Sequence, residues 1–229
     1  MQLDTRLRAA AEMIPQGARL ADIGSDHAYL PIALCLENKI EYARASDINE
    51  GPVSAARANV KKNGLGERIE VTRADGLDGA ESFEPDCIAV LGMGGELIAS
   101  ILDKAKWIKN GKITLVLQPM THAEILARYL AGQGFKILDE RIVCDNGRDD
   151  RIYRVIKAGY CGESYELSDL EALIGRINLD RGDNVTRALV EKSIRILEAR
   201  INGKAVSGAN AEYEKNLTEK MKSYLETKK

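Results

Sequence analysis

The chain has 229 residues, enough for one large domain or for a domain with a smaller one appended. Hydrophobic residues make up 45% of it and the formal net charge is −2, so it can bury a core but has no global basic field for nucleic acid. We find no cationic apolar leader and no apolar run of about 18 residues, which predicts a cytoplasmic chain and argues against secretion and membrane spanning.

Helical and strand signals alternate over the first 160 residues. Apolar patterns predict helices at residues 3–14, 28–37, 53–63, 96–102 and 123–131. Apolar runs bounded by turn residues predict strands at 19–23, 42–48, 69–73, 86–91, 113–117, 136–143 and 152–157. We expect a helix between each of the first six strands, and then a hairpin with Asn146-Gly147 at its turn. This order predicts an α/β fold with a doubly wound, mostly parallel sheet closed by an antiparallel hairpin.

The stretch LADIGSDHAYLP, residues 20–31, joins the first strand to the next helix. Gly24 permits a sharp turn before the helix N-terminus, which supplies free N–H groups and partial positive charge to a ligand. A dinucleotide fingerprint would have a second glycine where Asp26 stands. This extra carboxylate repels a pyrophosphate and attracts a cation.

S-adenosylmethionine meets that requirement, because it carries a sulfonium and an amino group and no phosphate. We therefore expect Asp22, Gly24 and Asp26 to shape the methionine end of a cofactor pocket. The charge argument disfavours NAD. A structural turn with surface carboxylates remains the alternative, since one turn cannot exclude it.

Acids also stand at the ends of the second and third predicted strands. Asp47 comes 25 positions after Asp22, close to the interval at which Rossmann-type folds place a carboxylate that accepts from ribose hydroxyls. Its alternative role is to cap the helix that begins near Pro52. Asp75 could accept from the adenine amino group while Gly76 lets the base approach the backbone, although an Asp-Gly pair is by itself usually a turn.

The fourth predicted strand runs into Gly92-Met93-Gly94-Gly95. Three glycines in four residues lose more conformational entropy on folding than a simple turn requires. We therefore expect another group to approach this backbone closely.

The chain changes character after Tyr165. Apolar residues recur there at three- and four-residue intervals, interrupted by Asn202-Gly203 and Ser207-Gly208, and a last helix covers residues 211–225. This pattern predicts two long amphipathic helices in an antiparallel coiled-coil hairpin. Positive side chains lie along the predicted helices, and they could form a solvated face or bind RNA. They are Arg176, Arg181, Arg187, Lys192, Arg195 and Arg200.

The histidines and cysteines do not form a metal-binding pattern. His27 and His122 are the only histidines, and the four cysteines are scattered without a CxxC pair. We expect no metal, and reduced thiols at Cys35, Cys87, Cys144 and Cys161.

These stretches together resemble the bacterial tRNA adenine-22 N1-methyltransferase family (TrmK). The matching pieces are RL at 6–7, ADIGSDHAYLPI at 21–32, SDINEGPVSAARANV at 46–60, ADGL at 74–77, LGMGGELIASIL at 91–102 and LQPM at 117–120. The resemblance implies a Rossmann-like class I methyltransferase domain over residues 1–160 and a helical coiled-coil domain over 161–229. It also implies methyl transfer from S-adenosyl-L-methionine to an adenine N1 in the D-arm of tRNA, by a monomer or weak homodimer.

Under this interpretation the candidate catalytic residues are Asp26, His27 and Tyr29. The candidate cofactor-binding residues are Asp22, Gly24, Ser25, Asp26, His27, Asp47, Ile48, Asp75, Gly76, Gly92, Met93 and Gly94. We expect the loss of Asp26 to be more damaging than the loss of His27.

Three other functions are compatible with parts of this pattern. A methyltransferase of the same fold could act on a small molecule or on another RNA position, although a small substrate would not need the basic helical tail. A module without catalysis could bind RNA or a partner protein through the helices. A nicotinamide-dependent oxidoreductase is disfavoured by Asp26 and by the lack of groups for hydride chemistry.

Overall fold

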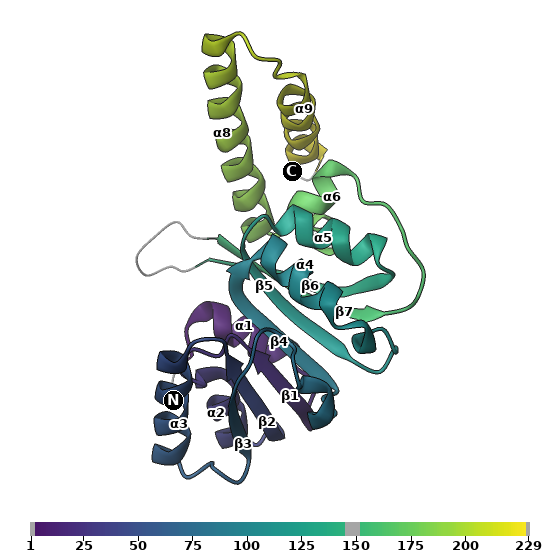
Figure 1. Cartoon of the computed structure of the whole chain (residues 1–229). Coiled ribbons are helices and arrows are strands. Elements are labelled where there is room, and N and C mark those ends of the chain that lie inside the picture. Colours follow the sequence, from purple (N-terminus) through teal and green to yellow (C-terminus); the bar gives the residue numbers. More distant parts are fainter. Residues whose placement is uncertain (1–2, 145–151, 228–229) are drawn as a thin grey trace. The chain divides into compact units, whose positions relative to one another are not determined.

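The computed structural model describes residues 3–144 and 152–227. The chain divides into two compact units, Met1–Tyr165 and Glu166–Lys229. The first is a sheet with helices on both faces, and the second is helical (Figure 1). Within the described ranges, no helix is both long enough and apolar enough to cross a membrane.

The first unit is built on a seven-stranded sheet with the order β3-β2-β1-β4-β5-β7-β6. The first five strands pair in parallel, and β7 runs antiparallel to both of its neighbours. The strands are β1 Ala18–Ile23, β2 Ile40–Asp47, β3 Ile69–Arg73, β4 Cys87–Gly94, β5 Thr114–Thr121, β6 Phe135–Cys144 and β7 Ile152–Tyr160. This confirms the predicted doubly wound sheet and its antiparallel closure. The Asn146-Gly147 turn lies outside the described residues.

Helices cover both faces of the sheet and form two separate cores. They are α1 Thr5–Met13, α2 Tyr29–Leu36, α3 Glu50–Lys62, α4 Gly95–Lys104 and α5 Ala123–Gly132. The side chains of α1, α2 and α3 share one buried cluster, and those of α4 and α5 share the other. The alternation along β4 explains this arrangement, because Ala89 faces the first cluster and its neighbours Ile88 and Val90 face the second.

Several predicted boundaries move by a few residues, and one predicted helix is absent. β4 and β5 both continue past the expected strand ends, so Gly92, Met93 and Gly94 lie in a strand rather than in a turn. The connection from β3 to β4 contains only the 3₁₀ turn η1, Ala80–Phe83, instead of the expected helix. A second 3₁₀ turn, η2 Lys106–Ile108, follows α4. The β3–β4 segment has too few apolar positions at helical spacing to cover this part of the sheet with a full helix.

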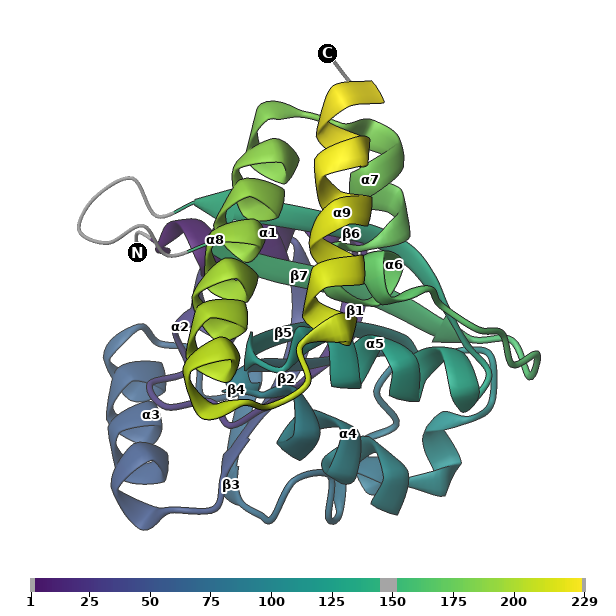
Figure 2. The same cartoon turned by 90° about the horizontal axis from the view of Figure 1, so that it is seen from above.

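The helical unit contains α6 Asp169–Ile174, α7 Arg176–Arg181, α8 Asn184–Ser207 and α9 Glu212–Thr227. Ser168 and Glu171 form a capping box on α6, and Asp183 caps α8 through the Thr186 N–H at 2.8 Å. The long helices α8 and α9 lie side by side and antiparallel (Figure 2). Lys204 contacts Glu214 at 2.6 Å, and Lys222 contacts Glu198 at 2.8 Å.

The tail therefore differs from the predicted pair of long helices. Its first apolar repeat forms the two short helices α6 and α7. The predicted break at Asn202-Gly203 is wrong, because α8 continues through both residues and ends before Gly208. One glycine inside a helix costs only about 1 kcal/mol relative to alanine, which the packing of a 24-residue helix can absorb. The unit is a helical hairpin with two short helices before it.

Candidate active site at the carboxyl edge of the sheet

The turn between β1 and α2 is held by the end of the neighbouring strand β2. The backbone N–H groups of Gly24 and Ser25 both donate to the Ser46 carbonyl, each at 2.8 Å. Gly24 adopts φ +74°, and a Cβ at this position would collide with Cε of Met93. Both N–H groups are thus already bonded within the chain and do not form a phosphate cradle. This agrees with the charge argument against a pyrophosphate.

Asp22 is buried below this turn. Ser25 Oγ donates to its carboxylate at 2.5 Å. Burial raises the pKa of Asp22 to about 6, while the Ser25 hydroxyl and the charge of Arg6 act in the opposite direction. A cation that entered the site would favour the ionised form and compensate for its desolvation.

The three predicted catalytic residues lie together at the rim. His27 Nε2 is 3.5 Å from the Asp26 carboxylate, and the His27 and Tyr29 rings stack with centroids 4.9 Å apart. The Asp26 side chain is 71% exposed and that of His27 39%, so a large substrate can reach both. Sequence reasoning missed Asn59, whose amide donates to the His27 carbonyl at 3.1 Å and fixes the loop.

This turn borders a cavity of about 260 Å³. The predicted residues that line it are Asp22, Gly24, Ser25, Asp26, His27 and Tyr29. The start of α1 adds Asp4, Arg6 and Leu7 to the lining. The volume lies just below the range of about 300–1,000 Å³ for small-molecule sites, so the cavity suits one part of a larger cofactor.

Sequence reasoning also missed a polar contact beneath the cavity. Arg6 Nη1 donates to Oε1 of Gln118 at 2.9 Å, and the Gly92 N–H donates to the same oxygen at 3.1 Å. Gln118 is fully buried within β5. The only sequence signal was that both residues fall in short segments that resemble the methyltransferase family.

The chain itself approaches the glycines at the end of β4. A Cβ on Gly95 would collide with the His122 carbonyl and lie 3.1 Å from the Thr121 carbonyl. A Cβ on Gly94 would lie 3.3 Å from Thr121 Oγ1. The sequence predicted a close approach here, and part of it comes from the connection between β5 and α5. Gly92, Met93 and Gly94 do not line the cavity, although their neighbour Leu91 does.

Asp47 and Ile48 lie at the end of β2, between β1 and β3 in the sheet. One Asp47 carboxylate oxygen accepts from the Asn49 N–H at 2.8 Å. Asn49, rather than Asp47, is the N-cap residue of α3. Ile48 is 52% exposed. Neither residue lines the cavity beside Asp22, so their cofactor-binding role stays a prediction based on their place at this edge.

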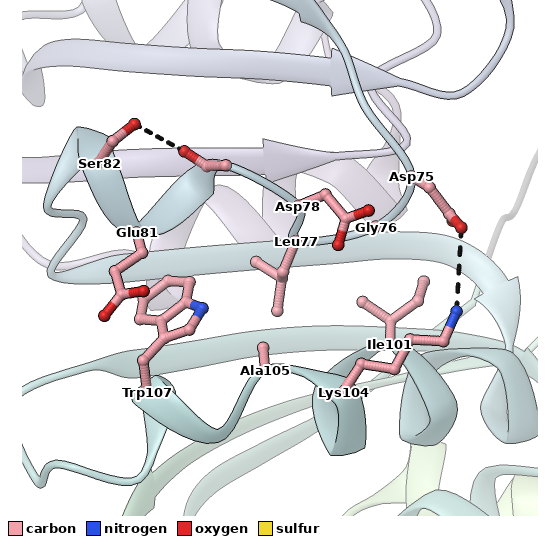
Figure 3. Close-up of a pocket in the computed structure, with 11 residues that line it drawn as sticks. Asp75, Gly76, Leu77, Asp78, Glu81, Ser82, Ile101, Lys104, Ala105 and Trp107 are labelled. Atoms are coloured by element: carbon pink, nitrogen blue, oxygen red, sulfur yellow. Dashed lines mark hydrogen bonds and ion pairs between the residues drawn. The ribbon is translucent and has the colours of Figure 1, made fainter.

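Asp75 and Gly76 border a second cavity, of about 530 Å³, between the β3–β4 connection and α4 (Figure 3). Asp75 is 3.8 Å from Lys104 Nζ, and both side chains are exposed. A Cβ on Gly76 would lie 3.1 Å from Ile101. Trp107 forms part of the far wall. The two cavities share no lining residue, so the structure does not bring Asp75 into one pocket with Asp22.

The sheet nevertheless brings the predicted acids to one edge. Asp22 lies near the end of β1 and Asp26 follows that strand, Asp47 ends β2, and Asp75 follows β3. These are three adjacent parallel strands. Ligands of open α/β sheets bind at this edge. This edge carries carboxylates, while the Gly24 and Ser25 N–H groups are already bonded and cannot bind a phosphate. Such an edge fits a nucleoside cofactor with a positive charge. Among the residues that the structure describes, no cluster of three or more potential metal ligands is present.

The comparisons with known proteins agree with this geometry. Residues 3–156 match the family model of a methyltransferase domain. A tRNA (adenine(22)-N(1))-methyltransferase of Bacillus subtilis is 40% identical over 182 residues, which are 80% of this chain and 72% of that relative. The chain belongs to the tRNA (adenine(22)-N(1))-methyltransferase family.

Solved structures of similar chains extend the likeness over both units. A Streptococcus pneumoniae protein in complex with S-adenosyl-L-methionine is 31% identical, with a TM-score of 0.85 and coverage of 98% of this chain and 100% of that chain. TrmK of M. capricolum, in complex with S-adenosyl-homocysteine, is 26% identical, with a TM-score of 0.80 and full coverage of both chains. These similarities confirm the predicted family and its Rossmann-like fold with a C-terminal helical region. They do not test the individual site residues.

Proposed function

We propose that this chain is an S-adenosylmethionine-dependent tRNA methyltransferase that modifies N1 of adenine 22 in the D-arm. The observation that carries the proposal is the 40% identity, over 80% of the chain, to a protein that is named for this reaction. The acidic cavity after β1 supports the cofactor, since its carboxylates suit a cation and its turn N–H groups are already bonded.

The residues of the rim suit a reaction that needs positioning more than base catalysis. When bound, S-adenosylmethionine supplies a methyl group on a positively charged sulfur. Neutral adenine N1 has a free lone pair, so the protein need not remove a proton before attack. Positive charge moves onto the base as the methyl transfers, and we assign its electrostatic stabilisation to the exposed carboxylate of Asp26.

Access to the target atom sets a second requirement. N1 lies on the pairing edge of adenine, so the base must be unpaired or flipped out of its stack. Tyr29 is 43% exposed and stacked on His27, which leaves an aromatic surface at the mouth of the cavity. Proteins that read unpaired bases use such surfaces for stacking. We assign Tyr29 and His27 to contact with the target base, and Asp26 to stabilisation of the positive charge that develops on that base.

The helical unit is the proposed tRNA-binding element, through local charges. It contains 12 lysines and arginines and 11 acidic residues, so it has almost no net charge. Arg195 and Arg200 lie exposed on α8. Phosphate contacts from such side chains add affinity without sequence preference. The proposal also places the enzyme in the cytoplasm, where its tRNA substrate is found.

Methylation of an unmodified tRNA transcript with labelled S-adenosylmethionine tests the proposal. We expect label at N1 of adenine 22, mapped by nuclease digestion and mass spectrometry. The matched control is the same transcript with guanine at position 22, which should remain unlabelled.

Label at another nucleotide would indicate that this chain is a methyltransferase for a different position in RNA. Cofactor binding without transfer to any tRNA would favour a small-molecule methyltransferase. Absence of cofactor binding would favour a binding module without catalysis.

A further inference from the structure

Arg6 stands in an unusual position for an arginine. Its side chain is only 22% exposed and lines the cavity beside the carboxylates of Asp22 and Asp26. It is the only arginine or lysine among the described residues that border this cavity. The cavity thus combines carboxylates with a single guanidinium.

The guanidinium is held from below by Gln118. The Gln118 amide nitrogen donates to the Pro119 carbonyl at 2.8 Å, which fixes the orientation of the amide. Its Oε1 then faces Arg6 Nη1 at 2.9 Å and the Gly92 N–H at 3.1 Å. Because Gln118 is fully buried, this contact anchors Arg6 to the end of β4.

Most of the donor capacity of Arg6 is not used by these contacts. A guanidinium has five N–H donors, and the hydrogen bond to Gln118 uses one. Arg6 Nη2 lies 3.6 Å from the Asp4 carboxylate, beyond hydrogen-bond distance, and the Asp4 side chain is 54% exposed. A long contact to an exposed carboxylate is weak, so Arg6 can exchange it for a better-placed carboxylate.

A cavity that is lined by both carboxylates and a guanidinium is complementary to an amino-acid zwitterion. The carboxylates of Asp22 and Asp26 suit an α-ammonium group, and a guanidinium can bind an α-carboxylate through two parallel hydrogen bonds. The methionine portion of the proposed cofactor carries both groups. An RNA phosphate is a poor alternative partner, because it would have to enter beside three acids, Asp4, Asp22 and Asp26.

We propose that Arg6 binds the α-carboxylate of the cofactor and thereby makes the site selective for a ligand with a complete amino-acid end. The inference rests on the proposed cofactor. It assigns the binding of a carboxylate to α1. The turn after β1 cannot do this, because it contains no lysine or arginine.

Calorimetry with two ligands tests this role without requiring turnover. S-adenosyl-homocysteine has the α-carboxylate, and its decarboxylated analogue keeps the ammonium and the nucleoside but lacks the carboxylate. We expect the wild-type chain to bind S-adenosyl-homocysteine about 10- to 100-fold more tightly than the analogue, the usual worth of a charge-assisted hydrogen bond. The Arg6→Met variant should bind both ligands with similar affinity.

Arg8→Met is the matched control. Arg8 lies on the same helix, but its guanidinium pairs with Glu37 at 2.8 Å and does not line the cavity. This variant should keep the wild-type preference between the two ligands. Thermal unfolding of both variants verifies that they fold. Arg6→Lys should recover part of the preference, because it restores the charge without the planar fork.

Two outcomes would overturn the inference. If Arg6→Met weakens both ligands by the same factor, Arg6 acts only as a structural clamp on β4. If it weakens neither ligand, Arg6 does not contact the cofactor. A wild-type chain that binds neither ligand would instead overturn the proposed cofactor, and with it this inference.

Discussion

Two connections at the carboxyl edge of the sheet are built in opposite ways. The connection after β1 has polar side chains, among them Asp26 and His27, which are exposed and contact each other loosely. At the second, β4 leads directly into α4 at Gly94-Gly95, and a Cβ on Gly95 would collide with the His122 carbonyl. The first site acts through functional groups and the second through close approach of the main chain.

This difference predicts which substitutions affect activity and which affect folding. An exposed side chain contributes little to stability, so its replacement should change chemistry alone. A glycine packed against a carbonyl leaves no room for a methyl group, so its replacement should change stability first. The predictions below test this contrast.

The largest effect is expected from Asp26→Ala, in the turn between β1 and α2. Turnover should fall about 100-fold or more, because the carboxylate that faces the developing positive charge is removed. The unfolding temperature should change little, since the Asp26 side chain is 71% exposed. Single-turnover methylation and thermal unfolding measure the two effects. Glu67→Ala, also exposed but outside both cavities, is the control. Near-normal turnover of Asp26→Ala would remove Asp26 from the catalytic assignment.

Gly95→Ala should destabilise the first unit by about 3 kcal/mol, because the new Cβ meets the His122 carbonyl rather than a flexible side chain. For a chain of this size, the unfolding temperature should fall by about 10 °C. Gly51→Ala on α3 provides a matched control, because a Cβ there has no heavy atom within 4 Å. An unchanged unfolding temperature for Gly95→Ala would show that the glycine is not required by packing.

The protonation of Asp22, below the turn between β1 and α2, makes the free energy of unfolding depend on pH. The pKa of Asp22 is raised from 3.8 to about 6, so the folded state binds this proton more tightly than the unfolded state. The bound proton of Asp22 therefore adds up to about 3 kcal/mol to the free energy of unfolding. This contribution is complete below pH 4 and is lost as the pH rises through 6.

Asp22→Asn should remove this dependence. The free energy of unfolding of the variant, relative to wild type, should therefore increase between pH 4 and pH 7.5. Urea unfolding at a series of pH values measures it. A constant difference across this range would contradict the burial of an ionisable Asp22.

The smallest effect is expected from His122→Gly, at the residue that packs against Gly95. His122 adopts a left-handed backbone with φ +53°, which glycine tolerates better. The variant should gain about 0.5 kcal/mol, since part of the relief is lost to the greater freedom of the unfolded chain. Thermal unfolding should show a rise of about 1–2 °C. A clear loss of stability would mean that the exposed contact of His122 with Glu124, at 3.5 Å, matters more than the backbone.

Much of the fold and half of the site could be predicted from local patterns. The alternation of apolar runs with helical repeats predicted the parallel sheet, because strands buried on both faces must be continuously apolar. Gly24 and Asp26 in one short turn predicted a site for a cation, since charge and backbone freedom are properties of neighbouring residues. The helical tail was predicted less well, because the break expected at Asn202-Gly203 relied on weak local preferences that packing overrode.

The sequence by itself determined the class of fold, the acidic turn after β1 and the resemblance to the family. Only the tertiary structure joined Arg6, which lines the first cavity, by a hydrogen bond to the buried Gln118, 112 positions away. It also decided that Asp75 borders a separate cavity and that Gly95 is required by His122. The physical reason is that turns and periodic patterns depend on adjacent residues, whereas contacts between distant segments depend on how the sheet aligns its strands.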